Sequence, residues 1–127
     1  MTILVVGGTQ GIVRLFINKY CLAVIIRPVQ GYWYKNDKLQ NRLFPYNGVL
    51  SIGPLSVEVT ELQKIGKVEF YINNRLVETD SVSPYRFYWT WRPIQAWQFR
   101  DNLSIVAYDI QGNHYSKDSI YPIFKIL

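Results

Sequence analysis

The sequence predicts an all-β fold, a sandwich of about seven antiparallel strands arranged in two sheets. Residues 67–80 alternate apolar and polar side chains, break at an Asn-Asn pair and then resume an extended pattern, as a β-hairpin does. Short segments of the same kind recur between turn signals, and none keeps a helical period. Aromatic residues make up 16% of the chain, and such side chains favour strands.

The predicted hairpin fixes the faces of its first strand. Val68, Phe70 and Ile72 fall on one face because side chains alternate along a strand. Asn73 and Asn74 follow, and asparagine tolerates the positive φ that a tight two-residue turn requires. No side chain of this hairpin is a strong nucleophile, so the segment indicates a scaffold and not an active site.

The remaining strands are predicted by the same alternation and by the turns between them. The candidate strands are Gly31–Tyr34, Val49–Ile52, Leu55–Val59, Lys67–Ile72, Arg75–Thr79, Tyr85–Trp91, Leu103–Asp109 and Ser119–Lys125. The expected core between the two sheets is Val68, Phe70, Ile72, Phe87, Trp89, Leu103, Ile105 and Ala107.

Residues 1–26 form an apolar segment whose structure the pattern leaves undetermined. They fit a pair of strands, Ile3–Val6 and Ile12–Ile17, or a short strand followed by a helix. A transmembrane helix would carry Arg14 and Lys19 in its interior, and no clear signal peptide is present. We therefore expect a β-sandwich domain over residues 27–127. In one interpretation, residues 1–26 are the remnant of a preceding region of a larger protein.

The charge and the cysteine content argue against a nucleic-acid-binding protein, a disulfide and a multi-cysteine metal site. The net charge is +5, but the basic residues are scattered singly, so no nucleic-acid partner is expected. Cys21 is the only cysteine and allows neither an intrachain disulfide nor a multi-cysteine metal site.

Several short motifs, taken in order, resemble the Ig-like modules of bacterial and archaeal extracellular proteins. They are Lys67–Ile72, Thr79-Asp80, Ser83–Tyr85, Trp89–Trp91 and Val106–Asp109 followed by Gly112-Asn113. Residues 31–60 are similar to the first strands of archaeal versions, so the resemblance covers roughly residues 27–125. Two departures are Asn73-Asn74 in place of Asp-Gly, and Arg86 after the Pro-Tyr pair. The resemblance implies an Ig-like sandwich that serves as a spacer, adhesion unit or sugar-binding appendage, outside the cell or at its surface.

No catalytic residue, cofactor or metal is expected. Val6–Ile12 is similar to the glycine-rich turn of short-chain dehydrogenases, but Val13 stands where a third glycine is expected and no βαβ unit follows. A fragment of a nucleotide-binding enzyme is therefore the less favoured alternative. His114 has no catalytic partner in the pattern, and the acidic residues are dispersed, which leaves a structural calcium ion as a minor alternative.

Four aromatic residues beyond the expected core are candidate ligand contacts: Trp33, Tyr71, Tyr88 and Trp97. Their rings suit stacking on sugars or contact with another protein, although cross-strand packing on the sheet surface explains them as well. Asn102 begins an N-glycosylation sequon.

The sequence thus predicts a non-catalytic spacer or interaction module of a secreted or cell-surface prokaryotic protein. Its expected partners are the neighbouring domains, with membrane contact only indirect. The alternative is a carbohydrate-binding or adhesion module that uses surface aromatics to bind a polysaccharide or another protein.

Overall fold

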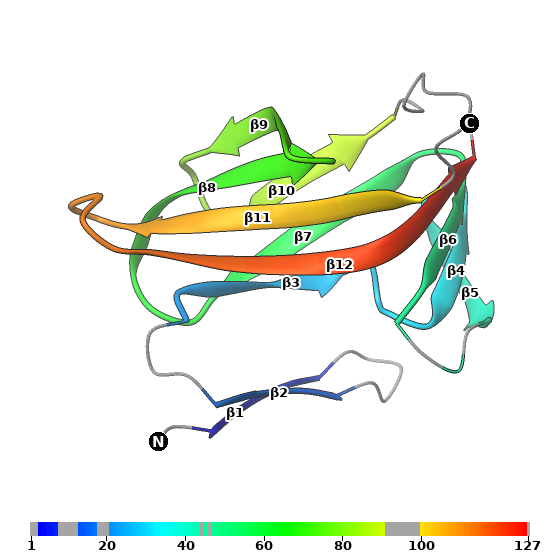
Figure 1. The fold of residues 1–127 in the computed structure, drawn as a ribbon, viewed down its shortest axis with the longest axis horizontal. Helices are drawn as coiled ribbons and strands as arrows, with labels where there is room; N and C mark the ends of the chain where they lie inside the picture. The colour runs from blue at the N-terminus through cyan, green and yellow to red at the C-terminus, as the bar shows by residue number, and fades with distance from the viewer. Residues whose placement is uncertain are drawn as a thin grey trace.

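Every regular element in the described part of the chain is a β-strand (Figure 1). The computed structural model describes residues 3–7, 13–17, 21–43, 45, 47–90 and 100–126, with 3–7 and 13–17 described as backbone. Ten of the strands form two sheets, which confirms the predicted all-β sandwich. No helix that could span a membrane occurs among the described residues.

The two sheets differ in size. The smaller sheet has the order β10 (Tyr85–Trp89), β7 (Leu55–Glu61), β3 (Ala23–Arg27). The larger sheet has the order β5 (Lys38–Arg42), β4 (Tyr32–Lys35), β6 (Val49–Ile52), β12 (Tyr115–Ile126), β11 (Asp101–Asp109), β8 (Ile65–Ile72), β9 (Arg75–Asp80). In Figure 1, β7 and β10 lie behind β8 and β11, so the sheets form two layers.

Most neighbouring strands pair antiparallel, as predicted, but β6 does not. It pairs parallel with both β4 and β12. The larger sheet also contains β5, which the sequence does not predict because Lys38–Arg42 has almost no apolar alternation. Such a short polar strand at a sheet edge discourages pairing with another chain.

All eight residues predicted for the core are buried between the sheets. Phe70 of β8 and Phe87 of β10 meet across the two layers, with ring centroids 5.8 Å apart. Strand β10 follows the expected alternation strictly, since Tyr85, Phe87 and Trp89 are buried while Arg86 and Tyr88 are exposed. The strand was predicted to continue to Trp91, but it ends at Trp89, Thr90 is not part of a strand, and Trp91 lies outside the described residues.

The hairpin between β8 and β9 forms as predicted and also clamps a third strand. Asn73 and Asn74 have φ values of 53° and 67°. The Asn73 amide nitrogen Nδ2 donates to Asp101 Oδ1 at 2.8 Å, and Asn73 Oδ1 accepts from the Asn102 backbone N–H at 2.8 Å. Asparagine therefore supplies here what glycine cannot, because its side chain ties the turn to the start of β11.

At the N-terminal side, β1 (Ile3–Gly7) and β2 (Val13–Ile17) form an antiparallel hairpin, so the two-strand interpretation of this segment is correct. The division into residues 1–26 and 27–127 stays a prediction, but β3 crosses that boundary and begins at Ala23. The sequence does not reveal this strand because Ala23 to Ile26 are all apolar, so no alternation with polar residues marks its two faces.

Side chains of β12 satisfy the free edge of β3. The Leu22 backbone N–H donates to Ser116 Oγ at 2.9 Å, and the Ile25 backbone N–H donates to Asp118 Oδ2 at 2.8 Å. These two bonds join the smaller sheet to the larger one at the point where the chain enters the sandwich.

A second polar clamp joins the β4–β5 turn to the smaller sheet. Asp37 Oδ1 forms an ion pair with Arg27 Nη2 at 2.9 Å and accepts the Ser56 backbone N–H at 2.6 Å, while the Ser56 hydroxyl donates to Asp37 Oδ2. The Arg27 guanidinium also lies 4.7 Å from the centre of the Tyr34 ring. One carboxylate thus holds groups from β3, β7 and the turn together.

Candidate functional site

The outer face of the larger sheet carries a surface of tyrosine and charged side chains. Where β8, β11 and β12 run side by side, their register places the outward residues in three rows. The rows are Lys67–Tyr108–Tyr115, Glu69–Val106–Lys117 and Tyr71–Ser104–Ser119. We call the six residues Lys67, Glu69, Tyr71, Tyr108, Tyr115 and Lys117 the tyrosine surface.

The alternation that builds the core also builds this surface. Outward and inward side chains alternate along each strand, and on β8 both Glu69 and Tyr71 lie between buried neighbours, as Glu69 does between Val68 and Phe70. A shift of one residue in register would exchange the two faces, so the buried core fixes which side chains point outward.

Glu69 is the centre of a hydrogen-bond network on this surface. Its Oε1 atom accepts the Tyr71 hydroxyl at 2.9 Å and the Tyr108 hydroxyl at 2.8 Å. Its Oε2 atom lies 3.9 Å from Lys67 Nζ, and that ammonium group lies 4.8 Å from the centre of the Tyr108 ring. One carboxylate therefore fixes two tyrosines from neighbouring strands.

The network changes the acidity of both phenols. The hydrogen bond to Glu69 is the main cause that raises the pKa of Tyr108 to about 12, with burial second. The same bond raises the pKa of Tyr71. Both hydroxyls therefore keep their protons at neutral pH and remain donors to the carboxylate.

The aromatic part of the surface faces solvent. The Tyr115 residue is 69% exposed, and its ring centroid lies 6.2 Å from that of Tyr108 at an interplanar angle of 43°. Fixed, exposed rings beside polar groups are suited to contact with sugars or with another protein. The arrangement offers binding and holds no nucleophile activated by a base.

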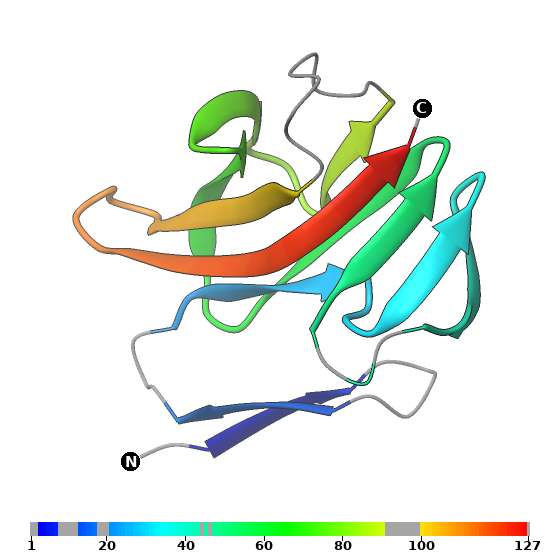
Figure 2. The ribbon, with the colours of Figure 1, turned by 45° about the vertical axis from the view of Figure 1, so that its right-hand side comes forward.

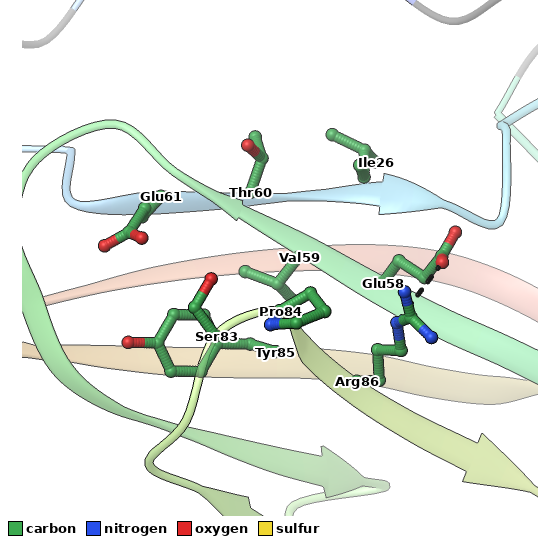
Figure 3. Close-up of a pocket in the computed structure, with 9 residues that line it drawn as sticks. All are labelled: Ile26, Glu58, Val59, Thr60, Glu61, Ser83, Pro84, Tyr85 and Arg86. Atoms are coloured by element: carbon green, nitrogen blue, oxygen red, sulfur yellow. Dashed lines mark ion pairs between the residues drawn. The ribbon is translucent and has the colours of Figure 1, made fainter.

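A pocket of about 290 Å³ lies on the smaller sheet (Figure 3). Its lining residues are Ile26, Glu58, Val59, Thr60, Glu61, Ser83, Pro84, Tyr85 and Arg86. Figure 3 shows Glu61 on the same side as Ser83 and Tyr85, with the ion pair Glu58–Arg86 on the opposite side. This pair is 3.6 Å long and largely exposed, so it orders the pocket only weakly. Burial, followed by the charges of Glu61 and Asp80, raises the pKa of Tyr85.

The predicted ligand contacts lie on different parts of the molecule. Tyr71 belongs to the tyrosine surface, whereas Trp33 lies on β4, which β6, β12 and β11 separate from β8. Tyr88 is 54% exposed on β10, in the other sheet. Trp97 lies outside the described residues. The structure thus brings neither Trp33 nor Tyr88 to Tyr71.

The sequence did not single out Tyr108, Tyr115 and Lys117 as contacts. Tyr108 follows the buried Ala107 by one position, so the alternation of its strand was the available signal for its outward direction. The strand register that places Tyr108 between Lys67 and Tyr115 joins segments that are distant in sequence, so no local pattern predicts it.

The other candidate residues of the sequence do not belong to the tyrosine surface. Asn102 lies on β11, where its Oδ1 atom is buried and has no hydrogen-bond partner among the described residues; its glycosylation stays a prediction. His114 is exposed beside the β11–β12 turn, and Cys21 is buried. No group of three or more metal-binding side chains occurs in the described part of the chain. Most of the turn Val6–Ile12 lies outside it.

Comparison with known proteins agrees with the architecture. The family model described as "Bacterial Ig domain" matches residues 52–114, which contain β7 to β11. A solved structure of Clostridium thermocellum CbhA fibronectin(III)-like modules is similar in fold, with a TM-score of 0.56 and 20% sequence identity. The similarity covers 84% of this chain and 100% of that chain. No curated protein matches this sequence.

Proposed function

Because this chain carries a bacterial Ig-like domain, we propose that it acts as a non-catalytic spacer and interaction module in a secreted or cell-surface protein. Its partners in this role are the neighbouring domains of a larger protein. Such a module must hold its neighbours apart and keep its fold when they pull on it.

The observation that carries this proposal is where the chain enters and leaves the sandwich. Leu22, just before β3, bonds to Ser116 near the start of β12, whereas β12 ends at Ile126. A strand rises about 3.3 Å per residue, so the two points are about 30 Å apart. Figures 1 and 2 show the start of β3 and the C-terminal end of β12 at opposite ends of the sandwich. Domains joined at these points would be separated by the long dimension of the module.

The pairing of the last strand suits this role. β12 pairs with β11 on one side and with β6 on the other. A force applied along β12 acts along the strand direction, so it loads the ladder hydrogen bonds on both sides together and not one after another. The bonds from Leu22 and Ile25 to β12 tie the entry strand to the same element.

Single-molecule stretching of the full chain, fused between two marker domains, tests the proposal. We expect one cooperative unfolding event in which residues 23–126 lengthen the molecule by about 330 Å, from about 3.5 Å per extended residue less the folded span. An Asp118→Ala variant should unfold at lower force with the same gain in length, because one edge bond of β3 is lost. Extension without a resolved force event would contradict the spacer role.

A further inference from the structure

We infer that the tyrosine surface binds an acidic polysaccharide, a sugar chain that carries carboxylate, sulfate or phosphate groups. This inference rests on the interaction part of the proposed function and names its ligand class and its residues. It stands on three features of the surface: rings that are already fixed, a carboxylate with remaining acceptor capacity, and lysines on the same face.

The rings are fixed before any ligand arrives. Tyr71 and Tyr108 are both held by Glu69, and the Tyr115 ring lies against that of Tyr108. Ordering a free side chain on binding costs affinity, so rings held in place lose less on contact with a sugar. Tyr115, beside the network, is 69% exposed, so its ring is accessible to a ligand.

The size of the surface suits a segment of a long, extended ligand. It spans three strands, about 10 Å across, and the four residue steps from Lys67 to Tyr71 add about 13 Å along β8. A sheet face of this size is open and not a closed pocket, so it fits a segment within a chain better than a free small molecule.

The polar groups suit sugar hydroxyls. Glu69 Oε1 accepts two phenolic hydroxyls, while Oε2 has the longer 3.9 Å contact with Lys67. A carboxylate oxygen accepts more than one hydrogen bond, so Oε2 retains capacity for a hydroxyl donor. Ser119, in the row of Tyr71, adds an exposed hydroxyl.

The charges favour an acidic ligand over a neutral one. Lys67 and Lys117 lie in adjacent rows, and Glu69 is the only acidic side chain among the nine row positions, so these rows carry net positive charge. Lys117 is exposed, and the whole chain has a net charge of +5. Such a field attracts polyanions and weakens with salt.

Affinity electrophoresis of the full chain tests the inference, with polygalacturonate as the acidic probe and hydroxyethylcellulose as the neutral one. We expect retardation by polygalacturonate and a binding constant at least about tenfold weaker for hydroxyethylcellulose. Tyr115→Ala should weaken polygalacturonate binding about tenfold, and Lys117→Gln severalfold with a smaller salt dependence. Tyr88→Ala is the matched control, because Tyr88 is 54% exposed on the other sheet, and it should bind as the unchanged chain does.

Three results would overturn the inference. The first is that polygalacturonate does not retard the chain. The second is that Tyr88→Ala and Tyr115→Ala weaken polygalacturonate binding equally. The third is that single-stranded DNA binds as tightly as polygalacturonate and that the same variants weaken its binding. Circular dichroism confirms that each variant is folded. Because these substitutions lie outside the core, stretching of the same variants should remain unchanged, so failure of the binding proposal and failure of the spacer proposal are distinguished.

Discussion

Replacing Asp37 by asparagine should destabilise the sandwich by a predictable amount. Asp37 lies in the β4–β5 turn at φ 66°, a conformation that asparagine also adopts, so the substitution removes the charge without adding backbone strain. The carboxylate bonds to Arg27 at 2.9 Å and to the Ser56 backbone N–H at 2.6 Å. Its loss therefore affects contacts to β3 and β7 at once.

The expected cost at pH 7 is about 2 kcal/mol. A hydrogen bond to a charged group contributes about 1.5–3 kcal/mol, and the Arg27 and Asp37 side chains are only 24% and 25% exposed, so solvent screens the pair only partly. For a domain of this size the melting temperature should fall by about 8 °C. Glu58→Gln is the control, because the Glu58–Arg86 pair is 35% and 62% exposed and should contribute less than about 0.5 kcal/mol.

The difference in unfolding free energy between the unchanged chain and the Asp37→Asn variant should also depend on pH. Burial acts to raise the pKa of Asp37, but the bonds from Ser56 and the charge of Arg27 outweigh burial and hold that pKa below its ordinary value of 3.8. A lowered pKa contributes stability above 3.8, and this stability is lost as the pH falls through the folded value. Urea unfolding of both chains at pH 7 and below pH 3.8 measures this, and the gap should narrow in acid. No gap at pH 7, or the same gap throughout, would refute the reasoning.

Three further predictions concern the turn, the tyrosine surface and the core. Asn73→Ala should cost about 2 kcal/mol in urea unfolding, because two side-chain bonds and a residue suited to positive φ are lost, whereas Asn74→Gly should be neutral or stabilising; equal losses would contradict this. In a spectrophotometric titration, Tyr108 should ionise near pH 12, and Glu69→Gln should move that step toward 10.0; an unchanged step would exclude the Glu69 bond as its cause. Phe70→Ala should cost about 3–5 kcal/mol in thermal unfolding, because Phe70 is fully buried between the sheets; a loss below about 1 kcal/mol would place it outside the core.

Local pattern was sufficient for much of the fold. Alternation in Lys67–Ile72 and Tyr85–Trp89 placed the core residues, because one-sided burial leaves a period of two in the sequence. The turn at Asn73-Asn74 was readable because few residues accept positive φ. The strands β3 and β5 were not predicted, because the first four residues of β3 are all apolar and β5 is polar almost throughout, so neither shows alternation.

The candidate site was less predictable, because it depends on pairing between distant segments. The alternation of its own strand is sufficient to identify Tyr71 as an outward residue. Its hydroxyl and that of Tyr108 both bond to Glu69, and this arrangement depends on the register of β8 against β11. Tyr115 joins through the β11–β12 pairing. In the same way, the parallel position of β6 between β4 and β12 is set by contacts across the sheet that no local motif encodes.

The distance between the entry and exit points of the sandwich tests the central claim most directly. Gln63 is exposed and its backbone N–H bonds to the Leu22 carbonyl, so a label at position 63 marks the entry end, and a label at Ile126 marks the exit end. After replacement of Cys21 by serine, spin labels at these two positions should give one narrow distance distribution centred at about 30 Å, from the length of β12 between Ser116 and Ile126. A distance below about 20 Å, or a broad distribution, would contradict a rigid module that separates its neighbours.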